Sequence, residues 1–335
     1  MNFKCVGLLA LACMAVGLVA ADKKMSETAG DAATGRPDFN NTWALSGPYT
    51  LEGLKGKLVV IRFFETGCPT CRATWPGMDE IRKSYDNQPV LFIGVSSGHP
   101  TSQVTTYAKA VKTEWSIYSD IDRSFETAYL KQVISLQNIY QNMIITPTGE
   151  FRGIGEIKAA VDRELPNAKW KMDPKEVPAA LKKAWFSLEF GQTAQAVTTI
   201  KQALGATDAV VKAAAQKLDA VVKEDIVKRM AEAAEKVAAQ QPWEGYKVYD
   251  FVTQNYKPYP EAAKAKSEMT TLESDAKVKK EKAAKIMLDK IQEWANSKVK
   301  TDRDNAKAGL TILQRDYADT EAGKSSQNVK VLDKV

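Results

Sequence analysis

Two cysteines separated by two residues constrain this chain more than any other feature of its sequence. Cys68 and Cys71 follow the segment of residues 54–64, which ends in an apolar run that only Arg62 interrupts. Such a run suits a central strand that is buried on both faces. The two cysteines precede apolar residues that recur at helical spacing. A bond between two thiols so close in sequence closes almost no loop and adds little stability. The pair therefore predicts chemistry rather than a structural disulfide.

The first 21 residues have the layout of a secretory signal peptide. Lys4 precedes an unbroken run of apolar and small residues that ends in a small-residue cleavage site at residues 19–21. The run is shorter than the roughly 20 apolar residues that a spanning helix needs. Two alternatives are an uncleaved anchor and a lipoprotein signal in which Cys13 is lipidated. We expect an exported protein, periplasmic or secreted, without a membrane span after cleavage.

Signal cleavage would leave Cys68 and Cys71 as the two cysteines of the mature chain. A structural zinc site takes four Cys or His ligands, and the sequence has one histidine, His99, so we expect no metal. We interpret His99 as an ordinary loop histidine. Thiol–disulfide exchange needs an attacking thiolate and a second thiol that resolves the mixed disulfide. The start of a helix favours the thiolate of the first cysteine, so Cys68 is expected to attack and Cys71 to resolve.

Strand and helix patterns alternate through the first half of the chain, which predicts an α/β domain with a mixed central sheet and flanking helices. After the CxxC come a second buried strand, a helix, a short strand, another helix and a hairpin with a Pro-Thr-Gly turn. These patterns occupy residues 89–97, 102–112, 115–120, 122–132 and 143–155. We place this domain at residues 43–165.

The run GKLVVIRFFETGCPTCRATWP resembles the strand–CxxC–Arg–Pro pattern of the thioredoxin superfamily, in the exported redoxin branch that includes the thioredoxin-like reductases of cytochrome c maturation. The hexapeptide CPTCRA, with Pro69 and Thr70, is similar to that of those reductases. Pro76 falls where the family has a proline that kinks its first active-site helix, and MIITPTGEF matches the family hairpin. The resemblance implies a thioredoxin-like thiol-disulfide oxidoreductase without a cofactor, which exchanges with protein thiols, protein disulfides and an upstream redox partner.

Several positions depart from the family pattern. Tyr140 stands where the family has the cis-proline that lies opposite the CxxC. The buried acid that many members place six residues before the first cysteine is Arg62, and the acid that some reductases place three residues after the second is Thr74. Glu65 is the nearest carboxylate in sequence that could take a proton from Cys71, with a solvated loop residue as the other interpretation. Substrate docking is the function that these departures affect most.

The second half of the chain has a different character. From about residue 173 it is rich in Ala, Lys, Glu and Leu, with apolar stripes at helical spacing. We expect residues 173–335 to form an all-α domain that folds alone, and a weak internal repeat makes a solenoid of tetratricopeptide-like hairpins one possible form. Residues 22–42 are polar and predict a disordered linker. The net charge is +6, but lysines and acidic residues are interspersed through the helical half, so no nucleic-acid partner is expected.

Three functions remain open from the sequence. The first is an exported thiol-disulfide oxidoreductase whose helical domain docks partner proteins. The second is a non-catalytic scaffold that retains the thioredoxin fold and binds partners through its helices. The third is a thiol peroxidase, although the Pro-x-x-x-Thr-x-x-Cys loop of that class is missing. The intact CxxC favours the first and the missing cis-proline the second. Redox direction depends on the surroundings of the sulfurs, which the sequence does not give.

Overall fold

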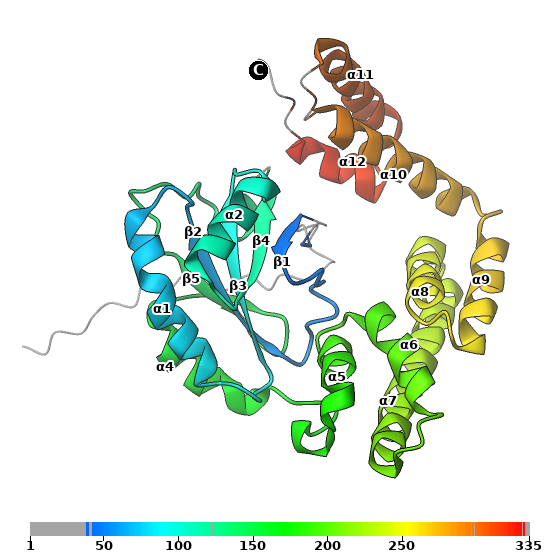
Figure 1. Ribbon diagram of the computed structural model, residues 1–335. Coiled ribbons are helices and arrows are strands. Elements are labelled where there is room, and N and C mark those ends of the chain that lie inside the picture. Colours follow the sequence, from blue (N-terminus) through cyan, green and yellow to red (C-terminus); the bar gives the residue numbers. More distant parts are fainter. Residues whose placement is uncertain are drawn as a thin grey trace, which may run out of the picture.

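A computed structural model describes residues 38–39, 42–121, 123–295, 297, 299–329 and 331 of the chain. The predicted signal peptide, Cys13 and most of the predicted linker lie outside the described residues. Figure 1 shows an α/β domain, coloured blue to green, followed by a region made of helices, coloured green to red. The fold class predicted from the sequence, a thioredoxin-like domain and then an all-α region, is confirmed.

A six-stranded mixed sheet forms the centre of the first domain, in the order β1-β4-β3-β2-β5-β6. Strands β2, β3 and β4 run parallel to one another, whereas β1, β5 and β6 run antiparallel to their neighbours. Every residue of β2 is buried, as expected of a central strand covered on both faces. The strands are β1 (Trp43–Leu45), β2 (Leu58–Phe64), β3 (Val90–Ser97), β4 (Ser116–Asp120), β5 (Asn142–Ile145) and β6 (Phe151–Ile154).

Helices α1 and α2 cover one face of this sheet (Figure 1). The ring of Phe64 on β2 lies 5.3 Å from Trp75 of α1 and 5.2 Å from Tyr107 of α2, and Trp75 Nε1 donates to Tyr107 Oη. Because side chains alternate along a strand, Arg62 shares the face of Phe64, while Phe63 faces α3 through Phe125. The helices of this domain are α1 (Pro69–Lys83), α2 (Thr101–Val111), α3 (Ser124–Leu130) and α4 (Ile157–Glu164).

The packed part of the first domain begins earlier than predicted. Phe39 is buried, with its ring 4.7 Å from Phe125 and 5.2 Å from Tyr118, and the carboxylate of Asp38 accepts the backbone N–H of Leu51. Of the predicted disordered linker, residues 38 and 39 are thus packed on the first domain, which corrects the prediction at these two positions. One aromatic residue in a polar stretch makes no periodic pattern, so the sequence did not indicate that Phe39 enters the core.

The helical region buries two apolar clusters of its own. One extends from α5 to α9 and includes Leu218, Val222 and Val252, and the other lies between α10 and α11 and includes Ile291 and Leu313. Successive helices pack on one another from α5 to α9 and again from α10 to α12 (Figure 1). The solenoid of tetratricopeptide-like hairpins stays a prediction. The helices are α5 (Lys182–Glu189), α6 (Thr193–Ala203), α7 (Ala209–Ala238), α8 (Pro242–Asn255), α9 (Pro260–Leu272), α10 (Ala276–Ala295), α11 (Lys300–Asp316) and α12 (Glu321–Ser325), with short 3-10 turns at Leu165–Asn167, Pro174–Glu176, Ala179–Leu181 and Ser326–Asn328.

A buried joint connects the two regions. Lys57, just before β2, forms a 2.6 Å ion pair with Glu189 at the end of α5, and the two side chains are 2% and 1% exposed. Phe190 packs into the core of the first domain. The backbones of Gly53 and Gly191 approach so closely that a Cβ on Gly53 would lie 2.9 Å from Gly191 Cα. Helix α5 thus contributes to the core of the helical region, and Phe190, which follows it, contributes to the core of the first domain. The predicted division at residues 165 and 173 precedes this joint in sequence.

Candidate active site

Cys68 and Cys71 lie at the start of α1 and are joined in a disulfide. Cys68 is the N-cap residue, and its Sγ accepts the backbone N–H of Cys71 at 3.0 Å. Cys68 is 5% exposed and Cys71 1% exposed, so the first cysteine is the more accessible one. A sulfur that accepts an N–H at a helix start sits where negative charge is favoured. This geometry is the one that the predicted roles of the two thiols require.

The other residues of the predicted motif lie where α1 begins. Pro69 occupies the first helical position, where its missing N–H leaves no hydrogen bond unmade. Pro69 and Thr70 are exposed beside the disulfide. Pro76 lies inside α1 and removes one N–H from the helical ladder, as the family proline does. Thr74, in the turn before Pro76, contacts the carbonyl oxygens of Thr70 and Cys71 through its hydroxyl at 3.1 Å.

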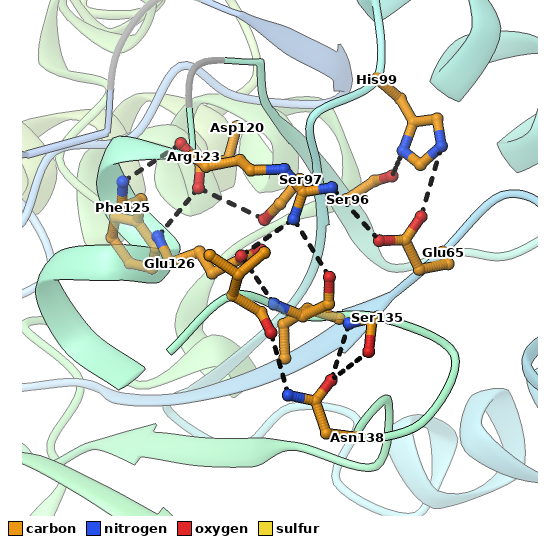
Figure 2. A network of polar contacts seen from close by, with 12 residues as sticks. Glu65, Ser96, Ser97, His99, Asp120, Arg123, Phe125, Glu126, Ser135 and Asn138 are labelled. Atoms are coloured by element: carbon orange, nitrogen blue, oxygen red, sulfur yellow. Dashed lines mark hydrogen bonds and ion pairs between the residues drawn. The ribbon is translucent and has the colours of Figure 1, made fainter. Parts of the chain in front are cut away.

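Glu65 lies in a buried network, so its interpretation as a solvated loop residue is wrong. Its carboxylate is 3.3 Å from His99 Nε2 and 3.6 Å from a terminal nitrogen of Arg123 (Figure 2). Burial raises the pKa of Glu65, and the nearby His99 and Arg123 partly oppose this shift. The backbone oxygen of Glu65 accepts the N–H of Cys68 at 3.1 Å, which ties the network to the first cysteine.

His99 and Arg123 were not identified as site residues from the sequence. His99 follows β3, where its Nδ1 lies 3.4 Å from Ser96 Oγ, and Arg123 follows β4 (Figure 2). Glu65 follows β2. The three strands are parallel neighbours, so the loops after them meet at one edge of the sheet. The strand patterns could have indicated this meeting point, because each of these residues lies within three residues of the end of a predicted strand.

The same network holds the loop between α3 and β5. Arg123 donates to Glu126 Oε1 at 3.0 Å and to the carbonyl oxygen of Ile134 at 3.1 Å, and Glu126 Oε1 accepts the N–H of Ile134 at 2.7 Å. Asp120 accepts the N–H groups of Phe125 and Glu126 at the start of α3 (Figure 2). This loop leads to Tyr140, so the network connects the CxxC edge with the position of the missing cis-proline.

Tyr140 lies at the end of that loop, just before β5. The carbonyl oxygen of the next residue, Gln141, accepts the N–H of Phe63 on β2 at 3.0 Å, which places the loop beside the strand that leads to the disulfide. Among the described residues the cis peptide bond found is the one before Pro48, so the bond before Tyr140 is trans. Tyr140 is 66% exposed. Its ring therefore offers an aromatic surface where the family has a proline.

Arg62 fills the position of the family's buried acid and contacts the second acid position directly. Its guanidinium donates to Thr74 Oγ1 at 2.9 Å and to Met78 Sδ at 3.3 Å, both on α1. Burial lowers the pKa of Arg62, and Tyr107 and Tyr140 lie near enough to oppose this shift. The two departures from the family pattern are thus partners: a buried cation and a hydroxyl replace two carboxylates.

No group of three or more His, Cys, Asp or Glu side chains in the described part of the chain could hold a metal ion. Over the same residues, no helix is both long enough and apolar enough to cross a bilayer.

Comparisons with known proteins agree on the first domain. Residues 32–151 match the AhpC/TSA family. The thiol-disulfide oxidoreductase ResA of Bacillus subtilis is 30% identical over 79 residues, which are 24% of this chain and 44% of ResA, so the match spans less than half the length of that relative.

Solved structures resemble about two fifths of the chain. A thioredoxin family thiol:disulfide interchange protein from Chlorobium tepidum TLS is 23% identical over 40% of this chain and 94% of its own, with a TM-score of 0.32. A thiol-disulfide isomerase from Corynebacterium glutamicum is 18% identical over 38% and 92%, with a TM-score of 0.33. By the family match, the strand order and the CxxC at the start of α1, the first domain of this chain is similar to the redoxins of the thioredoxin superfamily.

Proposed function

We propose that this protein is an exported thiol-disulfide oxidoreductase that uses Cys68 and Cys71 for dithiol–disulfide exchange with protein substrates. The observation that carries the proposal is the disulfide at the N-cap of α1, where Cys68 Sγ accepts the N–H of Cys71 in a redoxin domain. The 21-residue signal-like start of the sequence supports export, to the periplasm or the medium.

The exchange passes through a mixed disulfide. In the reduced protein the Cys68 thiolate attacks a substrate disulfide, an S–S bond forms between Cys68 and the substrate, and the second substrate sulfur leaves and takes a proton. Cys71 then loses its proton and attacks Cys68 Sγ, which releases the first substrate sulfur and restores the Cys68–Cys71 bond. Two electrons move to the substrate. Every step is reversible, so the same residues oxidise a substrate dithiol when the potentials favour it.

Glu65 is the residue that we propose to take the proton of Cys71. Burial raises the pKa of its carboxyl group, which brings the pKa closer to that of a thiol and suits proton exchange with it. His99 and Arg123 hold the carboxylate, and the backbone carbonyl oxygen of Glu65 accepts a hydrogen bond from the backbone N–H of Cys68. Pro69, Thr70, Pro76 and Tyr140 support the site by shaping the helix start and the facing loop.

The helical region is proposed to select partners. It is joined to the redox domain through the buried Lys57–Glu189 pair and through Phe190, so a protein bound on its helices would stand in a defined place relative to Cys68. An upstream redox partner would return the cysteine pair to its working state after each exchange.

The Cys71→Ser variant tests the proposal, because Cys68 still forms the mixed disulfide and nothing within the protein resolves it. Adducts are expected to accumulate on non-reducing gels of periplasmic extract and to be absent from the Cys68→Ser, Cys71→Ser double variant. Deleting residues 173–335 from the trapping variant is expected to change which partners appear.

A non-catalytic scaffold is the second candidate, and the trans peptide bond before the exposed Tyr140 favours it. A scaffold predicts no adducts from Cys71→Ser, together with partners that co-purify equally with the wild type and the double variant. That combination of results would refute the oxidoreductase and leave the cysteine pair as a remnant of the fold.

A further inference from the structure

The guanidinium of Arg62 is a buried positive charge behind the helix that carries the two cysteines. Arg62 is 7% exposed, and its terminal nitrogens donate to a hydroxyl, Thr74 Oγ1, and a thioether, Met78 Sδ. Among the described residues no carboxylate pairs with it, and its buried Nε has no hydrogen-bond partner. A buried ion without a counter-charge is strongly unfavourable. Its presence calls for a state of the site in which a negative charge lies nearby.

The cysteine pair is the neighbour that can supply this charge. Cys71, Thr74 and Met78 follow one another at spacings of three and four residues, so they share the face of α1 that lies against β2. Arg62 contacts the second and third of these residues, and the hydroxyl of Thr74 also lies 3.1 Å from the Cys71 carbonyl oxygen. Thr74 is about 4.5 Å along the helix axis from Cys71. The guanidinium is thus within about one helical turn of the buried sulfur.

The charge of the sulfurs depends on the redox state. A disulfide carries no charge, whereas the reduced pair at a helix start readily holds one thiolate. Opposite charges in a medium of low dielectric constant attract more strongly than in water. Arg62 therefore interacts weakly with the oxidised site and strongly with the reduced one, while a carboxylate in the same place would repel the thiolate.

We propose that Arg62 is the buried counter-charge of the reduced site, and that it biases the Cys68–Cys71 pair toward accepting electrons from substrate dithiols. This inference rests on the proposed exchange activity and gives that activity a direction. The substrate class is a protein or peptide dithiol. One S–S bond breaks in the site and one forms in the substrate, which gives up two electrons and two protons. One proton remains on the second thiol of the site and the other goes to solvent, and Arg62 itself transfers neither protons nor electrons.

The test is the equilibrium of the purified full chain with glutathione. Arg62→Met replaces the cation with an apolar side chain of similar length, and the equilibrium constant for reduction of the pair is expected to fall about tenfold, which corresponds to about 30 mV for a two-electron couple. The lowest thiol pKa, followed by thiolate absorbance in the ultraviolet, is expected to rise by about one unit. Arg62→Lys keeps a charge and should retain most of both properties.

Arg82→Met is the matched control, because Arg82 lies in the last turn of α1, far along the helix from the sulfurs, and pairs with Asp86. It should leave both readouts unchanged. If the wild type exchanges normally and the equilibrium constant of Arg62→Met for reduction by glutathione lies within twofold of its value, the inference is overturned. The proposed function would then still stand. A wild-type pair that does not equilibrate with glutathione would instead defeat the proposed function.

A measurement on the wild type covers the case in which Arg62→Met does not fold. Reduction of the pair by glutathione releases and takes up equal numbers of protons as long as every thiol is protonated, so its equilibrium constant is then independent of pH. Once a thiol of the site ionises, the constant rises with pH. For a stabilised thiolate this rise should start well below pH 8.5, the usual thiol pKa. A constant that stays level up to that pH would show that no stabilised thiolate exists, and it would overturn the role of Arg62.

Discussion

Glu65 is held by two basic side chains that come from other loops of the same sheet edge, His99 after β3 and Arg123 after β4 (Figure 2). Burial raises the pKa of Glu65 more than these partners lower it. A carboxyl group with a raised pKa keeps its proton to higher pH in the folded protein than in the unfolded chain. Its ionisation therefore reduces the stability of the fold progressively as pH rises above about 4.5.

Glu65→Gln should consequently change stability and activity in opposite directions. The variant lacks the ionisation, so its free energy of unfolding relative to the wild type is expected to be higher at pH 7 than at pH 4, as measured by urea denaturation at both values. Its rate of exchange with a disulfide-bonded peptide at pH 7 should fall about 100-fold, because no carboxylate takes the Cys71 proton. Glu52→Gln, which alters an exposed carboxylate, is the control, and identical behaviour of the two variants would contradict this role of Glu65.

The two cysteines and Tyr140 could be located from sequence because their information is local. A CxxC after a buried strand implies a helix start, and the hairpin fixes the count back to Tyr140. The burial of Glu65 could not be predicted, since the partners that hold it, His99 and Arg123, reach it only through the parallel pairing of β2, β3 and β4. The contact of Arg62 with Thr74 could not be predicted either, although the sequence shows that both residues depart from the family pattern.

At the scale of elements, the ion pair between Lys57 and Glu189 joins the start of β2 to the end of α5. Lys57 also donates to the carbonyl oxygen of Lys169, and Glu189 accepts the N–H groups of Lys171 and Met172, so the charges of the pair are well satisfied. Burial lowers the pKa of Lys57, and Glu189 opposes this shift. Removing one partner leaves a buried charge without its counter-charge.

Glu189→Leu alone is expected to lower the free energy of unfolding by about 3–5 kcal/mol, as measured by chemical denaturation. The double variant Lys57→Met, Glu189→Leu should recover most of this loss, because it leaves no unpaired ion. The exposed pair of Lys217 and Glu176 provides the comparison, and Glu176→Leu should change stability by less than about 1 kcal/mol. Equal losses in the single and double variants would show that packing, rather than charge, holds the joint.

Helix and strand patterns predicted most elements of the first domain, because periodic burial is visible in a short window of sequence. The joint was not predictable in this way. Lys57 reads as a surface lysine before a strand and Glu189 as a polar residue of an amphipathic helix, and their pairing has no local signature. Phe39 was missed for the same reason, since its partners Tyr118 and Phe125 lie far along the chain.

At the scale of the whole molecule, the helical region has two buried apolar clusters of its own, so we expect it to fold without the redox domain. The cluster between α10 and α11 has no residue at the joint, whereas the larger cluster reaches it through Met172 and Leu188. A fragment of residues 173–335 would nevertheless carry Glu189 and Phe190 without their partners.

We therefore expect the 173–335 fragment to show a helical circular dichroism spectrum and a cooperative transition, but at a lower denaturant concentration than the same region in the full chain. Restoring residues 38–172 on the same chain is the control. A random-coil spectrum would refute a separate helical domain, and a midpoint equal to that of the full chain would show that the joint adds nothing to its stability.

If the helical region binds partner proteins as proposed, the close approach of Gly53 and Gly191 affects how such a protein meets Cys68. Two sites that are connected by a flexible linker meet over a broad range of separations, and their effective concentration is set by the length of that linker. This joint does not allow a broad range of separations, because the two backbones are in contact there and the buried Lys57–Glu189 ion pair joins the same segments. For a protein held on the helices, the effective concentration of its sulfur at Cys68 becomes high when its span matches the distance and near zero when it does not. Such a chain would select its substrates by length as well as by affinity.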